Sequence, residues 1–206
     1  RMSLFAKICG LWRAAGVEAA AACRPDALGF VFWRGSRRCV AAADVDAWTR
    51  TLPPGILKVG VFVDQPADEI RAAARTAGLD VVQLHGAEGP DACAAAWPRV
   101  WKALKADEND PRRFAPYPVE AVVLDSGTAS MPGGTGLAGD WPKAARFVQE
   151  CGRPVLLAGG LRPENVAEAV RVVGPWGVDV SSGVELAPGR KDAARIEEFV
   201  RICRSL

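Results

Sequence analysis

Residues 154–165 read PVLLAGGLRPEN, and residues 177–185 read GVDVSSGVE. Each stretch begins with a short apolar run and ends in small residues, as a buried strand of a parallel sheet does where it enters a tight turn. Gly159 and Gly160 let backbone N–H groups approach a ligand closely, and the turn at Ser181-Ser182-Gly183 has free N–H groups that suit an anion. Taken singly, each turn is equally well explained without a ligand; together they predict a phosphate-binding cup.

The same alternation of apolar runs and helical stretches fills the rest of the chain. Further strands are expected at residues 4–9, 27–32, 58–63, 80–84, 100–104 and 121–125, and helices at residues 11–23, 44–52, 66–77, 90–97, 140–151, 163–173 and 191–204. Eight strands alternating with helices predict a parallel sheet closed into an α/β barrel of the (β/α)8, or TIM, type. In such barrels a phosphate site follows the seventh and eighth strands. The alternative is a doubly wound open sheet, in which the first and last strands do not pair.

Two segments interrupt the regular repeat. Three prolines in residues 107–118 predict a degenerate helix after the fifth strand. Residues 126–139, after the sixth strand, are rich in glycine and predict a long loop. The chain has 206 residues with no internal linker, so a single barrel domain over residues 2–206 is expected.

Composition excludes several classes of function. Acidic and basic residues are interspersed and the net charge is +2, which predicts neither a nucleic-acid partner nor a membrane surface. No apolar run reaches the roughly 18 residues of a membrane span. The six cysteines form no C-x-x-C pair, so free thiols in a reducing cytoplasm are expected. His85 is the only histidine, which argues against a metal site built from histidines.

In a barrel of this type, the site lies where the strands end. The first strand ends in Cys9, the fourth in His85 and the sixth in Asp125, and the eighth contains Asp179. Lys7 shares the face of Cys9 because side chains alternate along a strand, and a nearby lysine lowers the pKa of a thiol. His85 is more simply a hydrogen-bonded structural residue, and Asp179 either binds an amine or caps the next turn.

Cys9 and Asp125 form a candidate acid–base pair. Their strands lie three steps apart round a ring of eight, and strands spaced by ~4.8 Å make a barrel roughly 15 Å across between backbones. That separation leaves room for a sugar between one acid and one base. Each residue also has a structural explanation, because cysteines are often small core residues and aspartates often cap turns.

Two adjacent arginines, Arg37 and Arg38, follow the second strand. A guanidinium at this position can bind a carboxylate through two hydrogen bonds. A solvated basic loop is the other explanation.

Many short stretches, in order along almost the whole chain, resemble one enzyme family. They are KICG at 7–10, GFVF at 29–32, SRR at 36–38, VGVFV at 59–63, VQLHG at 82–86, LD at 124–125, PGGTG at 132–136, DW at 140–141, LAGGL at 157–161, PENV at 163–166 and VDVSSGVE at 178–185. The set resembles phosphoribosylanthranilate isomerase, the (β/α)8 enzyme of tryptophan biosynthesis.

The resemblance implies an Amadori rearrangement of N-(5-phosphoribosyl)anthranilate without cofactor or metal. It makes Cys9 the general base, Asp125 the general acid and Arg38 the ligand of the anthranilate carboxylate. It assigns the phosphate to the glycines and serines after the last two strands. Residues 11–15 and 137–139 depart from the family pattern. A monomer or a homodimer is expected.

Two other functions are compatible with the sequence. One is a related histidine-pathway or dual-specificity sugar isomerase, although those barrels carry aspartate where Cys9 stands. The other is a non-catalytic barrel that binds a phosphosugar, which the altered loops would favour.

Overall fold

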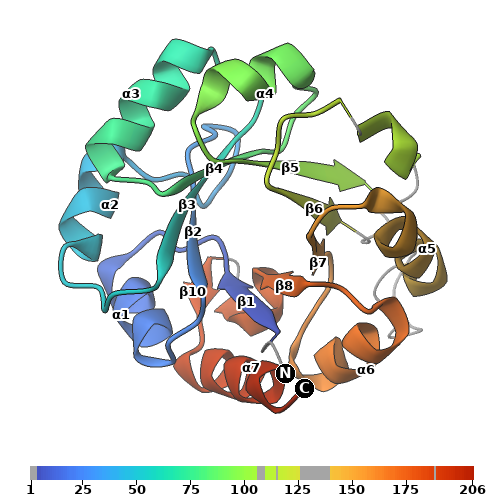
Figure 1. Cartoon of the computed structure of the whole chain (residues 1–206). Coiled ribbons are helices and arrows are strands. Elements are labelled where there is room, and N and C mark those ends of the chain that lie inside the picture. The colour runs from blue at the N-terminus through green and yellow to red at the C-terminus, as the bar shows by residue number, and fades with distance from the viewer. Residues whose placement is uncertain (1–3, 106–109, 115, 126–139, 188) are drawn as a thin grey trace.

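Eight short parallel strands form a closed ring surrounded by helices (Figure 1). The computed structural model describes residues 4–105, 110–114, 116–125, 140–187 and 189–206. The barrel strands are β1 (Phe5–Ile8), β2 (Ala27–Val31), β3 (Leu57–Phe62), β4 (Val81–Leu84), β5 (Val100–Lys105), β6 (Ala121–Asp125), β7 (Val155–Ala158) and β8 (Gly177–Val180).

The ring closes between the first and last strands. β1 pairs with β8 in parallel from Phe5 opposite Gly177 to Ile8 opposite Val180, and it pairs with β2 on its other side. The open-sheet alternative is therefore wrong, and the (β/α)8 prediction is confirmed.

Alternation along each strand separates two apolar cores. Phe5, Ala27, Val59 and Trp101 belong to the cluster inside the barrel. The intervening residues, such as Ile8 and Leu28, pack outward against the helices. Cys9, His85, Asp125 and Asp179 share the inward parity of the first set, so the strand period that builds the core also aims these side chains into the barrel.

Helices cover the outer face of the ring. They are α1 (Ala14–Ala22), α2 (Ala42–Thr49), α3 (Ala67–Ala77), α4 (Pro90–Ala96), α5 (Trp141–Cys151), α6 (Pro163–Val173) and α7 (Ala193–Ser205). Asp140 caps α5, as the sequence predicted: its Oδ1 accepts a hydrogen bond from the backbone N–H of Lys143 at 3.0 Å. Between β5 and β6, where a degenerate helix was expected, the described residues contain a 3-10 turn, η1 (Pro111–Phe114).

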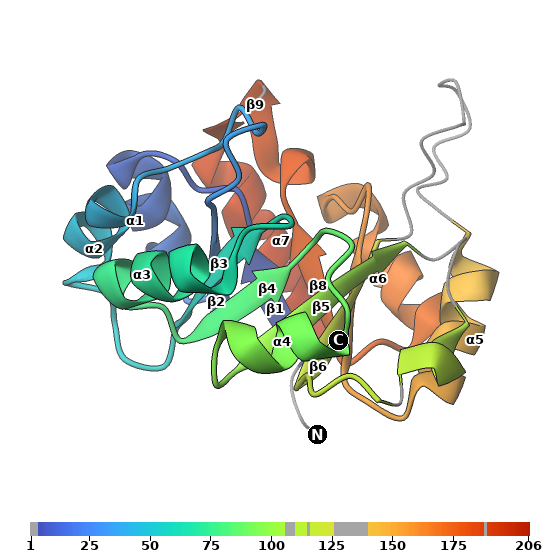
Figure 2. The same cartoon turned by 90° about the horizontal axis from the view of Figure 1, so that it is seen from above.

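Elements after β8 differ from the prediction. A 3-10 turn, η2 (Ser182–Val184), leads into an antiparallel hairpin of β9 (Glu185–Ala187) and β10 (Arg190–Lys191), which projects from one end of the barrel (Figure 2). The final helix begins at Ala193 rather than Lys191 because Asp192 caps it, its Oδ1 accepting from the N–H of Ala194 at 2.9 Å. The predicted glycine-rich loop at 126–139 lies outside the described residues.

The six cysteines, all within the described residues, carry free thiols. In the part of the chain that the structure describes, no helix is long and apolar enough to cross a membrane.

Candidate active site

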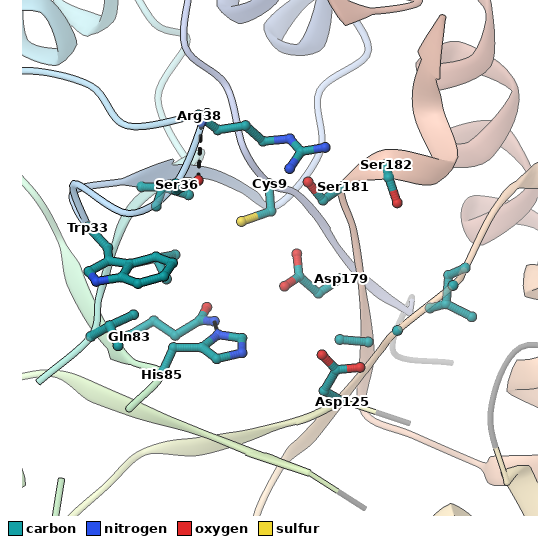
Figure 3. A pocket seen from close by; sticks show the side chains of 17 residues that line it. Cys9, Trp33, Ser36, Arg38, Gln83, His85, Asp125, Asp179, Ser181 and Ser182 are labelled. Atoms are coloured by element: carbon teal, nitrogen blue, oxygen red, sulfur yellow. Dashed lines mark hydrogen bonds between the residues drawn. The ribbon is translucent and has the colours of Figure 1, made fainter. Parts of the chain in front are cut away.

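A cavity of about 750 Å³ opens at the C-terminal ends of the barrel strands. The predicted site residues among its lining are Cys9, Arg38, His85, Asp125, Gly159, Gly160, Asp179, Ser181 and Ser182. In Figure 3 the side chains of Cys9, His85, Asp125 and Asp179 lie around one shared space. The structure therefore brings together residues from β1, β4, β6, β7 and β8 that are far apart in sequence.

Cys9 lies directly after β1, and the ion pair of Lys7 and Asp179 lies one pleat below it. Lys7 Nζ is 3.0 Å from each carboxylate oxygen of Asp179, and the Lys7 side chain is fully buried. Burial lowers the pKa of Lys7, but Asp179 and Cys9 outweigh it and the pKa is raised, so the ammonium stays charged. Burial raises the pKa of the Cys9 thiol, while Lys7 acts to lower it.

Gly29 creates the space that Cys9 occupies. A Cβ atom at Gly29 would lie 2.7 Å from Cys9 Sγ and 3.0 Å from Cys9 Cα. Any larger residue at this position of β2 would push the thiol away from its place above Lys7. In the sequence, Gly29 stood out only as part of the GFVF stretch. The structure explains why a glycine is needed at this position.

Asp125 faces Cys9 from the other side of the cavity. It ends β6, which is separated from β1 by β7 and β8, as the sequence predicted. In Figure 3 its carboxylate points into the same space as the thiol, with Asp179 between them. A substrate in this space would have an acidic group on one side and a thiol on the other.

The two turns that the sequence predicts to form a phosphate cup adjoin each other. Gly159 and Gly160 have φ values of 90° and 66°, in the left-handed region that glycine adopts without strain. Ser181 and Ser182 line the cavity beside them. Gly183 is outside the lining and has a different role, since a Cβ there would lie 1.8 Å from the Leu161 carbonyl oxygen. It allows the two turns to pack together.

Of the two adjacent arginines, only Arg38 lines the cavity; Arg37 is exposed. The guanidinium of Arg38 donates from Nε and Nη2 to the two carboxylate oxygens of Glu185, at 2.8 and 2.6 Å. These hydrogen bonds raise the pKa of Arg38. Sequence reasoning had not identified Glu185 as a functional residue, because its partner is far away in the chain.

His85 and Gln83 form another wall of the cavity. Gln83 Nε2 lies 3.4 Å from His85 Nδ1. Desolvation by the surrounding protein lowers the pKa of His85, so the imidazole is neutral at pH 7. The Oε1 atom of Gln83 is buried without a hydrogen-bond partner among the described residues. Gln83 and the half-exposed Trp33 also line the cavity, although the sequence analysis did not predict this. The signal for Gln83 was its inward position on β4, and the signal for Trp33 was its place just after β2.

The altered loop after β1 makes several contacts of its own. Leu11 is fully buried, and the indole N–H of Trp12 donates a hydrogen bond to the carbonyl oxygen of Gly189 in the β9–β10 hairpin. Arg13 stacks its guanidinium over the Trp12 ring at 4.2 Å. The other altered segment, 137–139, lies outside the described residues.

Residues 6–202 match the family model of N-(5'-phosphoribosyl)anthranilate (PRA) isomerase. The chain belongs to the N-(5'-phosphoribosyl)anthranilate isomerase family. A family member from Pelobacter propionicus is 45% identical over 199 residues, which are 96% of this chain and 94% of the relative. The phosphoribosylanthranilate isomerase structure from Thermus thermophilus has a TM-score of 0.86 and 37% identity, covering 98% of this chain and 99% of its own.

A second solved phosphoribosylanthranilate isomerase has a TM-score of 0.83 and 32% identity, covering 98% of this chain and 100% of its own. That protein was crystallised with reduced 1-(o-carboxyphenylamino)-1-deoxyribulose 5-phosphate bound. The predicted family is thus confirmed, and the chain is a PRA isomerase-family enzyme of tryptophan biosynthesis.

Proposed function

We propose that Cys9 and Asp125 catalyse the Amadori rearrangement of N-(5'-phosphoribosyl)anthranilate as general base and general acid. The product is 1-(2-carboxyphenylamino)-1-deoxyribulose 5-phosphate. One observation carries the assignment: the thiol, set above Lys7, faces the Asp125 carboxyl across a single cavity that also contains the phosphate cup.

The reaction needs one proton donated and another removed. Asp125 protonates the ring oxygen of the ribose as the bond from C1′ to that oxygen breaks, which leaves an open-chain Schiff base. Cys9 then removes the proton from C2′, and the electron pair of that C–H bond neutralises the iminium to give an enolamine. Tautomerisation of the enolamine gives the ketone, so the atoms balance without any external oxidant.

The substrate is held at its two charged groups, the phosphate and the carboxylate, so that its sugar lies between the acid and the base. The amides after β7 and β8, around Gly159, Gly160, Ser181 and Ser182, take the phosphate. Arg38 binds the anthranilate carboxylate, and Asp179 contacts the substrate beside its ion pair with Lys7. Gly183 supports the cup from behind.

Turnover of freshly prepared N-(5'-phosphoribosyl)anthranilate by the purified protein tests this function. Steady conversion, which Cys9→Ser and Asp125→Asn each slow by at least about a hundredfold, is the expected result. Conversion of the histidine-pathway aminoaldose at a comparable kcat/KM would instead support a dual-specificity enzyme, and binding without turnover a non-catalytic barrel.

Inorganic phosphate tests the cup separately. It should compete with the substrate, and a crystal soaked in phosphate should show the anion near Gly160 and Ser182. An anion bound only elsewhere would overturn this placement.

The reaction needs no cofactor and no metal, and the partner of the enzyme is the small phosphosugar carrying an anthranilate group. We place the enzyme in the cytoplasm because six free thiols suit a reducing compartment. We propose that the enzyme acts as a monomer or a homodimer. One barrel contains the acid, the base, the phosphate cup and Arg38 in a single cavity.

A further inference from the structure

A buried network lies behind Arg38, outside the cavity lining. Glu185 begins β9, and its side chain is 3% exposed. Besides the two hydrogen bonds from Arg38, it accepts one from Lys191 Nζ at 2.9 Å and one from the Gly189 N–H at 2.9 Å. Four donors therefore fix one carboxylate, which in turn fixes the guanidinium.

Lys191 connects this network to the phosphate end of the site. Its Nζ donates at 2.8 Å to the carbonyl oxygen of Ser181, whose side chain lines the cavity beside the cup. The Lys191 side chain is 2% exposed, so it does not itself meet the substrate. A single ammonium thus ties the support of Arg38 to the backbone of the phosphate turn.

The contact with Glu185 leaves one edge of Arg38 available. A guanidinium has five N–H groups, and Glu185 takes one from Nε and one from Nη2. Within the described residues, no hydrogen bond engages Nη1. The remaining edge can bind a second carboxylate in the same forked manner while the first holds the plane of the group.

Lys191 also adds a positive charge to the ion pair of Arg38 and Glu185. Arg38 and Glu185 alone would be neutral, and a neutral pair attracts an anionic substrate weakly. Lys191, 2.9 Å from the same carboxylate, leaves the trio with one net positive charge.

We infer that Glu185 and Lys191 are positioning residues for the carboxylate end of the substrate. Glu185 fixes the plane of the Arg38 guanidinium, and Lys191 keeps the trio cationic and aligned with the phosphate turn. The inference rests on the proposed role of Arg38 in binding the anthranilate carboxylate.

Steady-state kinetics on N-(5'-phosphoribosyl)anthranilate separate positioning from a purely structural role. Glu185→Gln places an amide N–H₂ opposite donors, so the guanidinium loses its fixed plane. We expect KM to rise about tenfold and kcat to change less than about threefold. A pure charge effect would lower KM instead, because Glu185→Gln makes the site more positive, and that outcome would overturn the inference.

Lys191→Met supplies a second, independent variant. It should raise KM about tenfold by neutralising the trio, and it should also weaken competitive inhibition by inorganic phosphate, whereas Glu185→Gln should leave that inhibition within about twofold. A Lys191→Met enzyme with wild-type KM and phosphate inhibition would contradict the role of Lys191. Glu120→Gln is the matched control, because it breaks an exposed pair with Arg99 at the opposite end of the barrel.

The double variant Arg38→Ala/Glu185→Gln separates the positioning role of Glu185 from the carboxylate-binding role of Arg38. If Glu185 acts through Arg38, the double variant has the KM of Arg38→Ala alone. Additive effects would overturn the positioning role while leaving Arg38 as the carboxylate ligand. An unchanged KM in Arg38→Ala itself would instead remove the proposed function of Arg38. Thermal unfolding of each variant shows that the comparison is made between folded enzymes.

Discussion

Lys7 Nζ lies 3.0 Å from both carboxylate oxygens of Asp179, and this buried ion pair stands one pleat below Cys9 on the inner face of the barrel. The register explains it, because Lys7 on β1 is directly opposite Asp179 on β8. Lys7 lowers the pKa of the thiol, and Asp179 and burial raise it, with burial the largest effect. The resting thiol is therefore protonated at neutral pH.

Cys9→Ser should reduce kcat by at least about a hundredfold. A general base contributes about 10²–10⁴-fold, and a hydroxyl of similar size has a pKa far above that of a thiol. Turnover measured beside thermal unfolding provides the check, since the fold and phosphate binding should survive. A variant with near-normal kcat would return Cys9 to the role of a small core residue.

Asp125→Asn should have a similar effect on kcat for a different reason. The amide preserves the shape of the side chain and removes the proton that opens the ribose ring. Single-turnover rates at saturating substrate report the chemical step directly. If the rate of that step equals the wild-type rate, the acid must be another group in the cavity.

Lys7→Met should change the pH profile in a defined direction. The active enzyme needs Cys9 deprotonated and Asp125 protonated, and because burial raises the thiol pKa, this form is a minor fraction at neutral pH. Loss of the ammonium raises the thiol pKa further. The alkaline limb of kcat/KM should therefore move to higher pH, and the plateau should fall about tenfold for each unit of that movement.

A merely structural role for Lys7 predicts another result. It would lower the unfolding temperature, because Asp179 would be left as an unpaired buried charge, but it would leave the alkaline limb in place. The position of that limb, measured well below the unfolding temperature, decides between the two roles.

Gly29→Ala should impair catalysis although Gly29 has no reactive group. The new methyl group would overlap Cys9 Sγ, so the thiol must move or the strand must shift. We expect at least about a tenfold loss of kcat and a loss of stability of about 1–3 kcal/mol, typical of overpacking. Gly89→Ala is the matched control, since no atom lies within 4 Å of a Cβ there. Equal kinetics in the two variants would contradict the packing argument.

Strand periodicity accounts for most of what the sequence predicted. Their places at or near the ends of predicted strands brought Cys9, Asp125 and Asp179 to one end of the barrel, and small residues at two strand ends predicted the phosphate cup. The residues after β2 offered both Arg37 and Arg38, and only the resemblance selected Arg38, because loops have no period. Glu185 was missed because β9 and β10 are too short to show alternation, and because its ion pair joins residues 147 positions apart.

The stability of the enzyme in acid should depend on Glu185. Burial acts to raise its pKa, but hydrogen bonds from Arg38, Lys191 and Gly189 prevail and lower it from 4.5 to about 2. A carboxyl with a depressed folded-state pKa stabilises the protein above its unfolded pKa, and this contribution is lost as the pH falls from about 4.5 towards 2. It amounts to on the order of 2 kcal/mol once solvent screening is allowed for. Urea unfolding at pH 6 and pH 3 should therefore show a smaller difference in unfolding free energy for Glu185→Gln than for the wild type. An identical difference would mean that Glu185 is not held as a carboxylate by its three partners.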